Sequence, residues 1–149
     1  MSSLRQQALK LLARREHSRA ELAQKLSATA AKEDIATVLD QLEQDGLLSD
    51  QRMAAAYLRS HAARFGLAKL RMNLRTKGVS HELIEQCLAQ GADSSASEEE
   101  RALQVWRRKF SQAPADPRQW AQQARFLQSR GFGADIISKT LKAVAEGEA

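Results

Sequence analysis

The chain has 149 residues and a formal net charge of +5, and 43% of its residues are hydrophobic while only 5% are aromatic. Abundant alanine with few aromatics favours helices packed through leucine and alanine over a β-sheet core. The single cysteine, Cys87, excludes an internal disulfide and a cysteine-rich metal site, and it favours a reducing compartment. The chain has neither an apolar leader nor a run of about 20 apolar residues, so we expect a cytoplasmic protein without a membrane segment.

The first 47 residues predict three helices, of which the middle one is short. Apolar residues from Leu4 to Leu12 recur at helical spacing. Ser18 followed by Glu21 is a capping box, in which a hydroxyl and a carboxylate satisfy free amides at a helix start. The stripe from Ile35 to Leu42 predicts the third helix, and Gly46 suits its C-terminal end.

Residues 48–91 repeat the same order of elements. Ser49 can cap a first helix, which Gly66 ends. A second short helix carries leucines at helical spacing and ends at Gly78. Ser80 can cap the third helix. This segment therefore predicts a second unit of three helices.

Residues 95–146 predict a third unit. Ser95 to Glu98 is a further capping box at a helix start. Asp116-Pro117 places a capping side chain just before a proline at the first helical position. The helix that follows ends at Gly131, and a last apolar stripe finishes the chain. The third unit therefore has three helices in the same order as the two preceding units.

The three units align by constant shifts along the chain. Ser18 aligns with Gly66, 48 residues later, and Gly78 aligns with Gly131, 53 residues later. Periods of this size are typical of repeat arrays, in which each unit buries its apolar face against its neighbours. We therefore predict an all-α fold of three tandem three-helix repeats that form an elongated, curved array. The expected repeats are residues 1–47, 48–91 and 95–146.

The side chains with catalytic or metal-binding chemistry are scattered. The three histidines are His17, His61 and His81. They lie far apart without cysteine or carboxylate at ligand spacing, so we expect no metal site and no cofactor. Cys87 falls on an apolar stripe, which favours a packed thiol over a nucleophile. Trp106 and Trp120 are spaced with other apolar residues, which favours the core over a base-stacking platform. No catalytic set appears, and an enzyme is the least favoured of the function classes.

The basic residues fall in two blocks. Residues 51–81 hold seven Lys/Arg and no Asp/Glu, and residues 103–134 hold six Lys/Arg against one Asp/Glu. An acidic stretch separates them. Any single cation can belong to an ordinary solvated helix face, but basic blocks of this length, the first of them free of acid, indicate contact with nucleic acid or with an acidic protein surface.

Three segments resemble the motifs of a known family. Leu48 to Leu58 resembles the Leu-(Ser/Asp)-Asp-x-Arg-(Phe/Tyr)-Ala-x-x-(Phe/Tyr) signature of the RecX family. Phe65 to Val79 and Phe126 to Phe132 are similar to its next two blocks, in the same order and spacing. One departure is Met53, where an aromatic residue is usual, but methionine can fill the same space.

The resemblance implies a fold of three tandem three-helix repeats and a regulator of the RecA recombinase. It implies binding to the RecA–DNA filament, with suppression of strand exchange, ATP hydrolysis and coprotease activity, and a place in DNA recombination, DNA repair and the SOS response. Members of this family are also reported to bind DNA. We further expect a monomer.

The first hypothesis is therefore a non-enzymatic regulator that lies along the RecA filament, and the alternative is a direct binder of single- or double-stranded DNA that uses its basic helical faces. The candidate contact residues are Arg52, Arg59, Arg71, Arg75, Lys77, Arg107, Arg108, Lys109, Arg125 and Arg130. Two of these have equally favoured structural alternatives. Arg52 can form an ion pair with Asp50 or with an acid of the first unit, and Arg130 can serve the dipole of a helix C-terminus.

Overall fold

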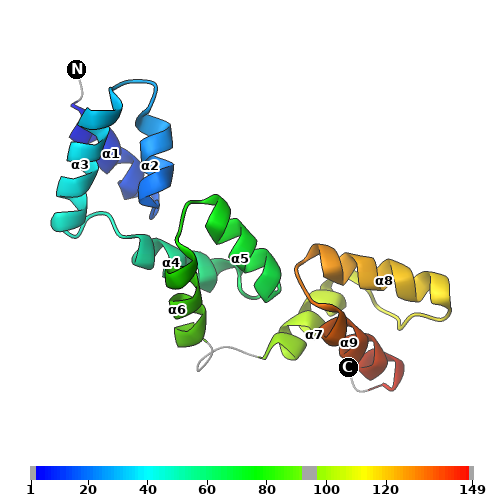
Figure 1. The fold of residues 1–149 in the computed structure, drawn as a ribbon. Helices are drawn as coiled ribbons and strands as arrows, with labels where there is room; N and C mark the ends of the chain where they lie inside the picture. The colour runs from blue at the N-terminus through cyan, green and yellow to red at the C-terminus, as the bar shows by residue number, and fades with distance from the viewer. Residues whose placement is uncertain (1–2, 92–96, 148–149) are drawn as a thin grey trace. The chain divides into compact units, whose positions relative to one another are not determined.

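The computed structural model describes residues 3–91 and 97–147. Within those residues there are nine α-helices and no strand, which confirms the all-α prediction (Figure 1). In chain order the helices are α1 (Leu4–Arg14), α2 (Arg19–Leu26), α3 (Lys32–Gln44), α4 (Asp50–His61), α5 (Leu67–Thr76), α6 (His81–Gly91), α7 (Glu98–Lys109), α8 (Pro117–Ser129) and α9 (Ala134–Ala145).

Two predicted helix starts are confirmed by their hydrogen bonds. The Ser18 hydroxyl accepts from the Glu21 amide at 3.0 Å, and the Glu21 carboxylate accepts from the Ser18 amide at 3.0 Å. The Asp116 carboxylate accepts from the Gln119 amide at 2.8 Å, and Pro117 is the first residue of α8. Both helices therefore begin where a side chain replaces the missing intrahelical acceptor.

The start of α7 differs from the prediction. Ser95, the first residue of the predicted capping box, lies outside the described residues. The cap of α7 is Ser97, whose hydroxyl accepts from the Glu100 amide at 3.2 Å. The helix therefore begins at Glu98, because Ser97 is the hydroxyl that reaches the third amide of the helix.

Glycines end three of the helices, as predicted. Gly46, Gly78 and Gly131 have φ angles of +76°, +89° and +94°. These angles lie in the left-handed region, where a Cβ atom would be strained, so glycine is the residue that ends the helix cleanly.

The chain forms two compact units, and their limits do not follow the predicted repeats. The first unit consists of residues 1–57 and 74–87, and the second consists of residues 58–73 and 88–149. The segment predicted as the second repeat contributes to both units. The repeat boundaries and the curvature of the array stay predictions.

The first unit is built around an aliphatic core from α1, α2 and α3. Cys87 also belongs to this unit and is 5% exposed, which confirms the predicted packed thiol. Burial raises the pKa of the Cys87 thiol above its ordinary value. The buried core residues are Ala8, Leu22, Leu26, Ile35, Leu39, Leu42 and Leu48.

The core of the second unit contains one of the two tryptophans. Trp106 is 5% exposed and its indole N–H donates to the Gln123 side-chain oxygen at 2.8 Å, which confirms its predicted burial. The prediction for Trp120 is wrong, because this residue is 42% exposed. Trp120 lies in the first turn of α8 and lines an open hollow with the preceding loop residues Pro114 and Ala115. The buried core residues are Ala102, Val105, Trp106, Leu127, Phe132, Ile137, Leu141 and Val144.

Candidate functional site

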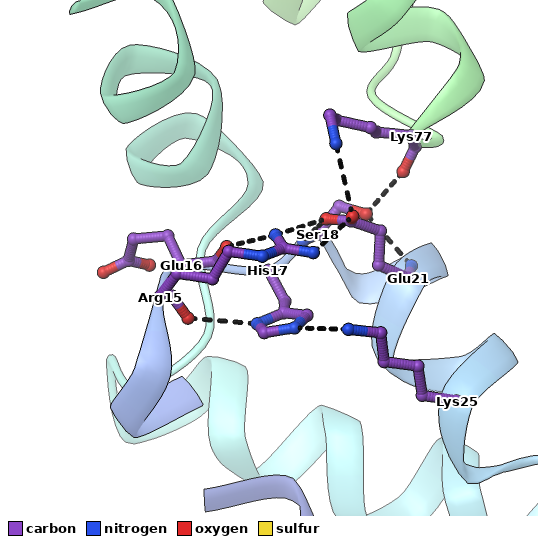
Figure 2. Close-up of polar contacts among 7 residues, drawn as sticks. All are labelled: Arg15, Glu16, His17, Ser18, Glu21, Lys25 and Lys77. Atoms are coloured by element: carbon purple, nitrogen blue, oxygen red, sulfur yellow. Dashed lines mark hydrogen bonds and ion pairs between the residues drawn. The ribbon is translucent and has the colours of Figure 1, made fainter. Parts of the chain in front are cut away.

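Within the first unit, the start of α2 is joined to the turn that follows α5 (Figure 2). The Ser18 hydroxyl donates a hydrogen bond to the backbone carbonyl of Lys77. A Cβ atom on Gly78 would lie 2.3 Å from the Cβ of Ala20, so only glycine permits this approach. We call these contacts of Ser18, Ala20, Lys77 and Gly78 the first joint.

Glu21 connects three elements at the first joint, as Figure 2 shows. Its carboxylate accepts from the Ser18 amide at 3.0 Å and from the Arg15 guanidinium at 3.1 Å, and it lies 3.6 Å from the Lys77 ammonium. Burial by itself would raise the pKa of Glu21, but the hydrogen bonds from Arg15 and Ser18 and the charge of Lys77 outweigh it and lower the pKa. The cation of Lys77, a predicted contact residue, is therefore held by an acid of α2.

His17 is buried beside the first joint, with 2% of its surface exposed. Its Nδ1 lies 3.0 Å from the Arg15 carbonyl and its Nε2 lies 3.0 Å from the Lys25 ammonium. An ammonium group can only donate, so Nε2 accepts and Nδ1 carries the hydrogen. Burial lowers the pKa of His17, and the positive charges of Arg15 and Lys25 add to this effect. His17 therefore serves the joint as a neutral ring, a role that its sequence position did not indicate.

Arg52 is also held by an acid of the first unit. Its Nε donates to the Glu16 carboxylate at 2.7 Å, and its Nη1 donates to the Gly46 carbonyl at 3.0 Å. Asp50, the other predicted partner, instead accepts from the Arg19 amide at 2.8 Å. The structural alternative for Arg52 is therefore confirmed, with the acid supplied by the first 47 residues.

Within the second unit, the start of α5 is joined to the turn that follows α8. The Gly66 amide donates to the Arg130 carbonyl at 2.7 Å, and the Ala68 amide donates to the Gly131 carbonyl at 3.3 Å. A Cβ atom on Gly131 would lie 2.3 Å from the Cβ of Lys69 and 2.5 Å from its backbone nitrogen. We call these contacts the second joint.

The two joints use equivalent positions of the sequence. Ser18 and Gly66, which the shift of 48 aligns, each donate a hydrogen bond to the carbonyl that precedes a left-handed glycine. Gly78 and Gly131, which the shift of 53 aligns, are those glycines. The first joint adds ionisable side chains around this contact, whereas the second adds aromatic rings.

Arg130 lies at the second joint between two of those rings. Its guanidinium carbon is 5.0 Å from the centroid of Phe126 and 6.0 Å from that of Phe65. The Lys109 ammonium lies 6.0 Å from the same Phe126 ring. Arg130 directly follows the last residue of α8, which is the position that the structural alternative of a cation at a helix C-terminus requires. Cation–π attraction orders both cations without neutralising their charge.

The other candidate contact residues differ in exposure. Arg71 of α5 is half-buried. Arg59, Arg75, Arg107, Arg108 and Arg125 are exposed, as are Arg52 and Lys109, which were described above. The structure thus separates nine of the ten candidates into acid-held, ring-held and other exposed cations, and it shows Arg71 as half-buried. It places Arg107 and Arg108 at the end of α7, directly before the ring-held Lys109.

One buried cation was missed in the sequence. Arg101 of α7 is 9% exposed, and its Nε and Nη2 are buried without a hydrogen-bond partner. Burial lowers the pKa of Arg101. The available signal was its spacing of four residues from Val105, which places both side chains on one face of α7.

Residues 3–91 and 97–147 contain no cluster of three or more His, Cys, Asp or Glu side chains arranged to hold a metal ion. None of the helices in these residues is long and apolar enough to cross a membrane.

The fold and the joints define a class of protein: a tandem array of three-helix domains that carries cations on its exposed helix faces. Family models for the first, second and third three-helix domains of RecX match residues 5–42, 49–88 and 97–141. The chain therefore belongs to the RecX family of regulatory proteins.

Relatives agree with this assignment, and a solved structure has a similar fold. The regulatory protein RecX of Leptothrix cholodnii is 45% identical over 94% of this chain and 88% of its own length. That of Herbaspirillum seropedicae is 45% identical over 94% of this chain and 90% of its own length. The crystal structure of RecX from Lactobacillus salivarius is similar in fold, with a TM-score of 0.76 and 20% identity over 96% of this chain and 95% of that one.

Proposed function

We propose that this chain regulates the RecA recombinase by binding the RecA–DNA filament and suppressing strand exchange, ATP hydrolysis and coprotease activity. The observation that carries the proposal is membership of the RecX family across all three domains, with relatives named regulatory protein RecX. The protein would act as a cytoplasmic monomer without catalytic chemistry of its own, in DNA recombination, DNA repair and the SOS response.

The contact surface that we propose consists of the exposed and ring-held cations. Arg52 and Lys77 already have carboxylate partners in the first unit, so moving them to a new partner would break existing ion pairs. Exposed arginines keep their donors available for carboxylate or phosphate. The proposed contacts are therefore Arg59, Arg75, Arg107, Arg108, Lys109, Arg125 and Arg130, while the half-buried Arg71 stays a predicted contact on the charge pattern alone.

The test is RecA ATP hydrolysis on single-stranded DNA with stoichiometric amounts of the chain. The wild-type chain should inhibit, and the Arg107→Glu/Arg108→Glu variant should need at least tenfold more protein for the same inhibition. The matched control is Lys10→Glu/Arg14→Glu, because Arg14 also lies in the last turn of a helix, α1, and both residues are exposed. An absence of inhibition by the wild type, or equal inhibition by the two variants, would contradict the proposal.

A second candidate function is direct binding of DNA. The observation that favours it is the segment 103–134, where six Lys/Arg accompany one Asp/Glu. Phosphate contacts from these cations would release counterions, so the logarithm of affinity for a single strand should fall with the logarithm of salt by about 0.7 per contact. Binding without such salt dependence would rule this function out.

A further inference from the structure

An open hollow lies where the loop after α7 enters α8 (Figure 1). Its lining combines apolar surface with one carboxylate, and it consists of Pro114, Ala115, Asp116, Pro117 and Trp120. Trp120 is 42% exposed, so its indole ring is a wall of the hollow that a partner can reach. Tryptophan is enriched among the residues that contribute most to protein–protein binding, which makes this hollow a candidate contact surface.

Hydrogen bonds hold the hollow in shape. The Gln119 side-chain oxygen accepts from the Ala115 amide at 2.8 Å, and the Gln123 side-chain nitrogen donates to the Gln112 carbonyl at 3.2 Å. Gln123 is itself buried and accepts from the indole N–H of Trp106 in the core. The loop is therefore attached to α8 at two points, and a partner does not have to order it on binding.

The hollow brings together two groups that attract a cation. One oxygen of Asp116 caps α8, and within residues 3–91 and 97–147 no cation forms an ion pair with this carboxylate. Nor does any lysine or arginine of those residues lie over the Trp120 ring, although the rings of Tyr57, Phe65 and Phe126 each have a cation above them. A carboxylate attracts a cation by its charge, and the tryptophan ring is the strongest cation–π partner among the aromatic side chains.

The charge around the hollow indicates what kind of surface carries this cation. Asp116 is the one acid among residues 103–134, which hold six Lys/Arg. A segment so basic repels a partner that is basic throughout. A single arginine on an otherwise acidic surface meets no such repulsion, because its acidic neighbours face the cations of this segment. Arginine suits the hollow better than lysine does, since a planar guanidinium stacks on a ring and bonds a carboxylate at the same time.

We propose that the hollow of Asp116 and Trp120 binds an arginine side chain on the protein surface of the RecA filament. The guanidinium stacks on the Trp120 ring and donates to the carboxylate of Asp116, while its apolar stem lies against Pro114 and Pro117. The inference rests on the proposed function and adds to it a contact of opposite sign, in which the partner supplies the cation and this chain supplies the acid.

The experiment measures binding of the full chain to RecA filaments assembled on immobilised single-stranded DNA with a non-hydrolysable ATP analogue. Asp116→Asn removes the charge and keeps the helix cap, because asparagine caps a helix as well as aspartate does. Trp120→Leu removes the ring and keeps an apolar side chain. Each variant should weaken binding about threefold to tenfold, and Trp120→Tyr, which restores a ring, should recover part of the loss.

Asp135→Asn is the matched control. Asp135 is also an exposed acid in the first turn of a helix, α9. Removing an acid from a basic protein strengthens its general attraction to an acidic partner, so Asp135→Asn should leave binding unchanged or slightly tighter. A cation in the hollow predicts the opposite sign for Asp116→Asn alone. Urea unfolding of each variant establishes that the fold is kept.

Each other outcome has a definite meaning. If the wild type binds no filament, the proposed function fails and this inference fails with it. If the wild type binds and Asp116→Asn binds equally well, the proposed function stands and the arginine contact is overturned. Tighter binding by Asp116→Asn together with weaker binding by Trp120→Leu would indicate a nucleic-acid base or an apolar side chain on the ring, which also overturns the proposal.

A measurement without these substitutions tests whether the hollow is covered. The chain can be prepared with 5-hydroxytryptophan in place of tryptophan, which is excited at wavelengths where natural tryptophan absorbs little. Acrylamide should quench the exposed residue 120 in the free chain, and filament binding should protect it. Unchanged quenching at saturating filament would overturn the proposal, because the ring would then still face solvent.

Discussion

Replacing Gly131 by alanine tests how tightly the second joint is packed. The φ angle of +94° makes any Cβ unfavourable there by about 1–2 kcal/mol. The new Cβ would also lie 2.3 Å from the Cβ of Lys69 and 2.5 Å from its backbone nitrogen, so the backbone of α5 has to move. Overpacking of this kind adds about 1–3 kcal/mol. We therefore expect a loss of about 2–5 kcal/mol in the free energy of unfolding.

Gly46→Ala is the matched control. Gly46 has a φ of +76° and nothing within 4 Å of the position of its added Cβ, so the substitution introduces backbone strain alone, about 1–2 kcal/mol. Urea unfolding followed by far-ultraviolet circular dichroism measures both variants. The difference between them isolates the contact with Lys69. Equal destabilisation by the two substitutions would refute the reasoning, because the joint would then tolerate a methyl group.

Three further predictions concern the first joint and the two tryptophans. Because the pKa of His17 is lowered in the folded chain, the unfolded chain takes up a proton first as the pH falls, so stability should decrease as the pH drops below about 6.5. Urea unfolding at a series of pH values measures this dependence, and His17→Gln should flatten it. Ser18→Ala should cost about 1–3 kcal/mol in the same assay, because it removes both a helix cap and the partner of the Lys77 carbonyl; a loss below about 0.5 kcal/mol would contradict this. Trp106→Ala should lower the free energy of unfolding by about 3–5 kcal/mol, whereas Trp120→Ala should change it by no more than about 1 kcal/mol. Iodide should also quench the fluorescence of the exposed Trp120 more than that of the buried Trp106.

Local features of the fold were predictable from the sequence. The caps Ser18 and Asp116 and the terminal glycines Gly46, Gly78 and Gly131 all have the predicted roles. Each of these depends on groups within about four residues, namely free amides at a helix start or a left-handed φ at a helix end. The same reasoning predicted Ser95 as the cap of α7, two residues before the actual cap, Ser97. Neighbouring serines offer the same local signal, so the sequence does not distinguish between them.

What the sequence by itself determined is therefore the set of helices, their ends and the blocks of charge, because these follow from spacing along one chain segment. The state of each cation was decided by tertiary structure. Arg52 meets Glu16 from 36 residues away, and Arg130 lies against Phe65 of the turn between α4 and α5. The two tryptophans show the same division, since both fit a helical stripe but only Trp106 is covered. Helical spacing assigns a side chain to a face, and long-range packing decides whether that face meets an acid, a ring, another helix or water.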